Sequence, residues 1–168
     1  MLPKDIGVVV MVVAPLLLLG QALQGSGRRG SPARSDQPTV EISSVKISPE
    51  RIRTQKGEKP NTATITIEVF HTPLGSDQSV TLNLGSYSSS PQMGVSVKYR
   101  PASQEMVLRS GAAGAVLGMV EVSEPEIGGN AAATINVVAT LSKPSPGIRI
   151  VNDDPSLPSH QATLTIVR

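Results

Sequence analysis

The chain has 168 residues, enough for one domain, and contains no cysteine, which excludes disulfides, thiolate metal sites and cysteine nucleophiles. Its formal net charge is +2, but 11 basic and 12 acidic residues lie from Asp36 to Arg168, so the part expected to fold is nearly neutral. Only Phe70, Tyr87 and Tyr99 are aromatic, and without a basic face the composition predicts no nucleic-acid binding.

The N-terminus carries an uncharged apolar run, Ile6–Leu19, that continues weakly to Leu23. Residues 1–23 are predicted to form a hydrophobic helix that targets the chain for export. Lys4 precedes the run, and a small residue at Ala22 suits signal-peptide cleavage after it. A cleaved signal peptide is therefore the favoured interpretation.

Two alternatives stay open for this segment. Residues 6–23 could remain as a membrane tether, although Arg28 and Arg29 behind them would favour the cytoplasmic side. The run could also be a buried core helix. Both the cleaved signal peptide and the membrane tether predict that the rest of the chain is extracellular, periplasmic or on the outer face of a membrane.

Residues 24–38 consist mainly of Gly, Ser, Pro, Gln and Arg, with almost nothing to bury. This composition predicts a flexible basic linker. Its three arginines could touch anionic lipid headgroups, but a solvated tether is the simpler interpretation.

Residues 39–168 show a two-residue alternation of apolar and polar side chains, which is typical of half-buried strands. The clearest examples are Thr64–Val69, Val80–Leu84, Val95–Tyr99, Ile135–Leu141 and Ala162–Ile166. Weaker candidates are Val40–Ile47, Glu105–Leu108, Val116–Val122 and Ile148–Val151.

Clusters of turn residues separate these segments, and no stretch shows a sustained helical period. Pro125–Asn130 and Lys143–Gly147 are two such clusters, and Val151–Gln161 should be an irregular loop. Short strands at this spacing predict an all-β, two-sheet antiparallel sandwich over residues 39–168.

The strands from Ala63 onward resemble immunoglobulin-like modules of bacterial exported proteins. In the last third, Ala133–Gly147, with the turn Leu141-Ser-Lys-Pro-Ser-Pro-Gly147, and the strand Ala162–Val167 resemble the closing strands of Calx-beta domains. The resemblance implies an immunoglobulin-like sandwich. Calx-beta domains also bind calcium through acids clustered around strand ends.

Asp153 and Asp154 form the only adjacent pair of acids within this domain, and their hard oxygens could bind Ca²⁺. Glu121, Glu124 and Glu126 could add ligands if folding brings them close. The alternative is that Asn152–Pro155 is a turn whose side chains bond their own backbone. We favour the turn, and expect no cofactor otherwise.

The only histidines are His71 and His160, which with Met93 or Met106 could bind copper. The four residues lack ligand spacing, so we expect the histidines to be solvated at loop ends. For catalysis, no serine lies in a Gly-x-Ser-x-Gly motif, no glycine-rich phosphate loop follows a strand, and aromatic sugar platforms are missing. The chain is therefore predicted not to be an enzyme.

Arg51, Arg53, Lys56 and Lys59 make a basic stretch interrupted by acids, which could dock an acidic partner but is better interpreted as a solvated loop. The favoured function is a non-catalytic interaction or structural module of the cell envelope or secreted fraction. It would bind a protein or cell-surface partner through its loops or a sheet edge. The alternative is an exported protein that binds calcium, another metal or a small ligand.

Overall fold

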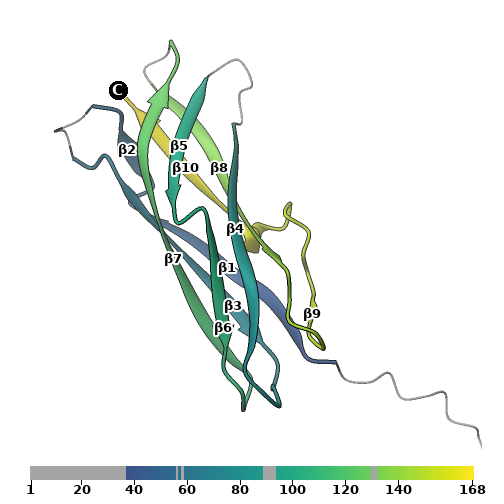
Figure 1. The fold of residues 1–168 in the computed structure, drawn as a ribbon. Helices are drawn as coiled ribbons and strands as arrows, with labels where there is room; N and C mark the ends of the chain where they lie inside the picture. The colour runs from purple at the N-terminus through teal and green to yellow at the C-terminus, as the bar shows by residue number, and fades with distance from the viewer. Residues whose placement is uncertain (1–36, 56, 58, 89–93, 130–131) are drawn as a thin grey trace, which may run out of the picture. The chain divides into compact units, whose positions relative to one another are not determined.

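The computed structural model describes residues 37–55, 57, 59–88, 94–129 and 132–168. The predicted targeting helix (1–23) and nearly all of the linker (24–38) lie outside these residues, so both stay predictions. Among the described residues, no helix is long and apolar enough to span a membrane. The described part is all-β, with two five-stranded sheets and one short 3₁₀ helix, η1 (Pro158–His160) (Figure 1).

The first sheet holds its strands in an order that differs from chain order. That order is β5 (Val95–Arg100), β7 (Gly114–Ile127), β3 (Ala63–His71), β1 (Thr39–Ser48) and β9 (Arg149–Ile150). β3 is central, and pairs antiparallel with β1 and β7.

The second sheet has the order β2 (Arg51–Arg53), β10 (Gln161–Val167), β8 (Ala132–Ser142), β4 (Gln78–Ser88) and β6 (Ser103–Leu108). Most pairs are antiparallel, as predicted. Two short pairs, β1 with β9 and β2 with β10, are parallel.

The core is aliphatic and draws on both sheets, as the alternation predicts. Ile65, Ile67 and Val69 of β3 are fully buried, and so are Leu164 and Ile166 of β10. With so few aromatic residues in the chain, branched aliphatic side chains fill the space between the sheets.

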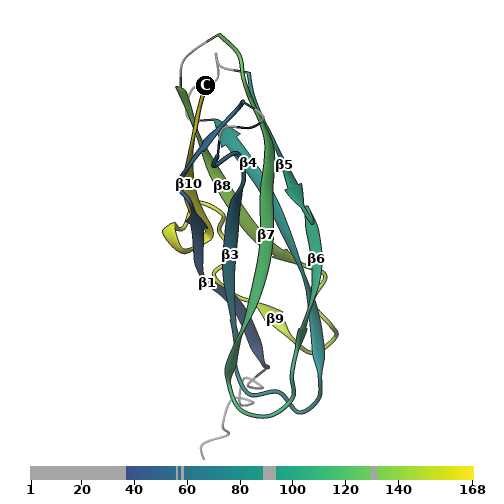
Figure 2. The ribbon, with the colours of Figure 1, turned by 90° about the vertical axis from the view of Figure 1, so that its left-hand side faces the viewer.

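Successive strands alternate between the two sheets, and two of the connections between them are short and begin with a proline. β1 is followed by Pro49 and then by β2 in the second sheet. β5 is followed by Pro101 and then by β6, and Figure 2 shows β5 running into β6 along one side of the fold. Because proline has no N–H to donate to a ladder, it suits a point where pairing ends.

Several predicted boundaries are wrong. Arg51 and Arg53 lie on β2, paired with β10, and not in the loop that the sequence predicts. β7 extends through Pro125 to Ile127, although Pro125–Asn130 was predicted as a turn. The predicted loop Val151–Gln161 contains η1 and the first residue of β10.

Candidate functional site

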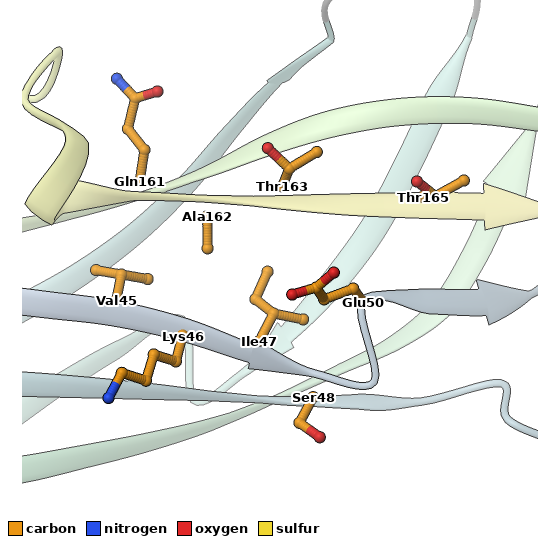
Figure 3. A pocket seen from close by; sticks show the side chains of 9 residues that line it. All are labelled: Val45, Lys46, Ile47, Ser48, Glu50, Gln161, Ala162, Thr163 and Thr165. Atoms are coloured by element: carbon orange, nitrogen blue, oxygen red, sulfur yellow. The ribbon is translucent and has the colours of Figure 1, made fainter.

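A groove opens where β1 and β10 lie side by side in different sheets. Its volume is about 660 Å³, and Figure 3 shows the nine side chains around it. It exists because the chain crosses to the second sheet only after Pro49, so β1 and β10 are not paired with each other. We call it the β1–β10 groove.

The floor of the groove is apolar. Val45 and Ile47 of β1 and Ala162 of β10 point into the space between the two strands (Figure 3). Val45 and Ile47 are buried, and Ala162 packs against the same core. The floor is therefore the margin of the hydrophobic core, open to solvent on one side.

Polar side chains make up the rest of the lining. They are Lys46, Ser48, Glu50, Gln161, Thr163 and Thr165. The Gln161 amide is held in place, because its Nε2 donates to Pro155 O at 2.8 Å and its Oε1 accepts from Tyr87 OH at 2.9 Å.

Unpaired strand edges flank the groove. On the side away from β3, no described strand pairs with β1 beyond Val40. On the side away from β8, β2 pairs only with Thr165–Val167 of β10. The Thr165 N–H donates to Glu50 O at 2.9 Å on this side. Backbone groups of every second residue point to the same side of a strand, so the N–H and C=O of Thr163 also point away from β8.

The loop between β9 and η1 is fastened to the first half of β1. The Val151 N–H donates to Val40 O at 3.0 Å, and the Asn152 amide donates to the Glu41 carboxylate. η1 follows this loop and ends in the buried His160.

His160 is only 2% exposed, and neither ring nitrogen has a hydrogen-bond partner within 3.5 Å among the described residues. Burial lowers the pKa of the imidazole below its usual value, although the carboxylates of Asp153, Asp154 and Glu41 act in the opposite direction. His71 is also buried, with Nδ1 2.9 Å from Thr72 O. The expectation of solvated histidines is wrong for both.

The predicted metal ligands are not gathered into one site. The Asp154 carboxylate accepts a hydrogen bond from the Ser156 N–H at 2.8 Å, which lowers its pKa and matches the predicted turn, while Asp153 is exposed. Among the described residues, no three His, Asp or Glu side chains could hold a metal ion together. Calcium binding at this pair stays the alternative to the turn that we favour.

The fold brings Glu121, Glu124 and Glu126 of β7 to one hollow of about 450 Å³, whose lining does not include Asp153 or Asp154. Glu124 on β7 forms ion pairs with Lys98 and Arg100 of β5. Met106 is buried in the core, and Met93 lies outside the described residues.

The basic stretch is partly gathered by the fold. Arg51, Arg53 and Lys59 line a hollow of about 560 Å³ together with Arg168, which pairing between β2 and β10 brings close. Lys56 lies outside the described residues. Arg51 and Arg53 are therefore residues of β2, the edge strand of the second sheet, and Arg168 directly follows β10.

Sequence reasoning missed the β1–β10 groove because its residues share no motif. The available signal was Pro49, which interrupts the apolar pattern between Ile47 and Ile52. A proline there marks the end of a ladder, but sequence alone does not say which strand lies opposite.

No protein-family model matches the sequence, and no curated protein is significantly similar to it. Solved structures share its general architecture at low identity. The apo form of the Calx CBD1 domain is 14% identical with a TM-score of 0.38, over 76% of this chain and 96% of that one.

A bacterial adhesin from Mobiluncus mulieris is 9% identical with a TM-score of 0.46, over 77% of this chain and 57% of that one. The cupredoxin domain of amoB from Nitrosocaldus yellowstonii is 8% identical with a TM-score of 0.37, over 77% of this chain and 87% of that one. Identities and scores this low do not assign the chain to a family or say what it binds.

Proposed function

We propose that this chain is an exported, non-catalytic, immunoglobulin-like module that binds an extended segment of a protein partner in the β1–β10 groove. The observation that carries the proposal is the combination of an apolar floor with unpaired backbone edges on both sides of it. Strand addition uses such a combination, because main-chain hydrogen bonds provide affinity and side-chain pockets provide selectivity.

The size of the groove limits what it can bind. The floor spans Val45 and Ile47 on one strand and Ala162 on the other. Alternate residues of a strand point to the same face, so a bound segment would place about two apolar side chains on this floor. The Lys46 and Glu50 side chains on the lining offer one charge of each sign to the polar residues of that segment.

The absence of catalysis belongs to the same proposal. The groove lining contains no histidine, and its one carboxylate, Glu50, has no second acid beside it in the lining. A hydroxyl such as that of Ser48 or Thr163 becomes an effective nucleophile only with a base positioned beside it, and the lining holds no histidine for that role.

The test uses a charge placed in the floor. Ala162→Glu should abolish capture of a partner from the native cell envelope by the full chain, because a carboxylate would have to be buried against the bound segment. Ala112→Glu, the same substitution in an exposed loop, should capture the partner as the unmodified chain does. Equal melting temperatures for the two variants would show that both are folded.

A partner that binds equally to the Ala162→Glu variant would contradict the groove as the binding site. N-terminal sequencing of the mature chain tests the export part separately. A chain that starts at Leu23 would show signal-peptide cleavage, and an intact N-terminus on material from inside the cell would contradict export.

A further inference from the structure

A second open edge lies on the opposite side of the first sheet, on β7. β3 pairs with β7 along Gly114–Val122, but β5 pairs with it only along Glu121–Ile127. On the side away from β3, no described residue pairs with Ala115–Val120, either in a ladder or by an isolated backbone hydrogen bond. The edge is open because β5 leaves this sheet after Arg100 and continues as β6 in the other.

This edge is uncharged and apolar. The six residues Ala115–Val120 read Ala-Val-Leu-Gly-Met-Val, with no charge and no proline. Leu117 is 60% exposed and Met119 62% exposed on the outer face of the sheet, and Phe70 on β3 lies beside Ala115. Natural proteins normally protect open edges with charges, prolines or bulges, so an unprotected edge marks a surface that another strand covers.

The edge is held in position by the loops at its start. Asp77 accepts hydrogen bonds from the Ser110 N–H and from the Arg109 guanidinium, both at 2.7 Å. Leu74 and Gly111 exchange backbone hydrogen bonds of 3.0 and 2.9 Å. A strand that is already ordered loses little conformational entropy when a partner joins it.

We propose that a second copy of this chain pairs with β7, antiparallel and centred on Gly118. The sequence around this glycine is symmetric in character, because Val116 and Leu117 precede it and Met119 and Val120 follow it. An antiparallel pair around a two-fold axis places Leu117 opposite Met119 of the second copy, and Val116 opposite Val120. The four large apolar residues of the edge, Val116, Leu117, Met119 and Val120, then each face an apolar residue.

The same register opposes no like charges. The nearest charge along the outer face of β7 is Glu121, which pairs with Arg100 of β5 and therefore lies just beyond the residues that the second copy can join. The pairing also covers the exposed Leu117 and Met119 side chains of both copies. The first sheet of one copy and the first sheet of the other then form one continuous sheet. This surface is separate from the β1–β10 groove, so the two proposals stand or fall independently.

Sedimentation equilibrium of the full chain, as its host processes it, tests the pairing. The chain should pass from monomer to dimer between about 1 µM and 1 mM, the range expected for a small interface. The double variant L117K/M119K should raise the dissociation constant at least about tenfold, because like charges directly opposite each other destabilise a strand pair. Val107→Lys, a matched change at another exposed apolar residue, should leave it unchanged.

Mixing of charge variants identifies the register. L117K/M119K and L117E/M119E should each be monomeric alone and should form a heterodimer when mixed, since opposite charges then face each other. A wild-type chain that stays monomeric at 1 mM, a dimer that L117K/M119K leaves intact, or a mixture that stays monomeric would each overturn the proposal. The first result is also the one expected if a different protein covers the edge.

Discussion

The first sheet has an incompletely paired strand edge on each side, β1 on one and β7 on the other, and the two edges differ in their side chains. On one side the chain leaves the first sheet after β1, and on the other after β5, each time next to a proline. The β1 edge has a bulge between Ile42 and Ser44 and carries the exposed Lys46, whereas the β7 edge has neither a bulge nor a charge along Ala115–Val120. The comparison teaches that two edges left unpaired in the same way differ in exposure to pairing because of their charges and bulges.

The difference extends to the space behind each edge. Behind β1 the sheets leave the β1–β10 groove open. Behind β7 they lie close together, since a Cβ placed on Gly118 would be 2.7 Å from Leu82 Cδ2 and 3.6 Å from Met106 Sδ. The β1 side therefore has a groove between two strand edges, whereas the β7 side has closely packed sheets and an uncharged, apolar strand edge.

The largest expected effect tests this close approach. Gly118→Val should lower the free energy of unfolding by about 1–3 kcal/mol, because the added side chain meets the packed Leu82 side chain. Gly85→Val is the matched control in β4, where nothing lies within 4 Å of the added Cβ, and its effect should stay within about 0.5 kcal/mol. Urea denaturation measures both; equal midpoints would mean that the sheets are not in close contact at β7.

A smaller effect is expected at the β1 side, where His160 anchors a loop against the core. Burial lowers its pKa in the folded state below the ordinary 6.5, so the unfolded chain takes up the proton first as the pH falls. The stability associated with neutral His160 is present above about pH 6.5 and is lost as the pH falls toward the folded-state pKa.

Urea midpoints at about pH 7.5 and 5.5 measure this loss, and those pH values bracket the ordinary histidine pKa. The His160→Leu variant should show a smaller difference between the two midpoints than the unmodified chain. If both proteins show the same difference, another group is responsible and His160 is not the titrating residue.

The smallest expected effect is that of calcium. Millimolar Ca²⁺ should leave the melting temperature unchanged, because the Asp154 carboxylate is already bonded to the Ser156 N–H and no described third acid joins the pair into a ligand cluster. A melting temperature that rises with calcium and returns with a chelator would show binding to the folded state and would restore the alternative function.

The sequence predicts the longer strands because each of them has its own alternation of apolar and polar residues. Ile65, Ile67 and Val69 alternate with polar residues, and the structure confirms their burial. The short β2 was missed because three residues with one apolar side chain, Ile52, are too few for a pattern. The histidines were misjudged because polar residues near strand ends are usually solvated, whereas His160 lies on η1 and packs against β1.

The candidate surfaces could not be predicted for a different reason. An edge is open when pairing stops partway along a strand, as it does on β7 between Val120 and Glu121. That depends on where β5 changes sheets, and no local property of residues 115–120 records it. Their lack of charge is visible in the sequence, but it is equally typical of a fully paired central strand.

The parallel pair of β2 and β10 has a mechanical consequence. β1, β2 and β10 all run in the same direction, so the chain enters the fold at Thr39 at one end and β10 finishes at the other (Figure 1). Tension applied between these two points would pull β2 and β10 along their length in opposite directions, which loads the ladder of Arg51–Arg53 with Thr165–Val167 in shear. The backbone hydrogen bonds of the ladder would then bear the force together and would not break one after another. A module suspended between an anchor and a moving partner would resist extension through this short clamp.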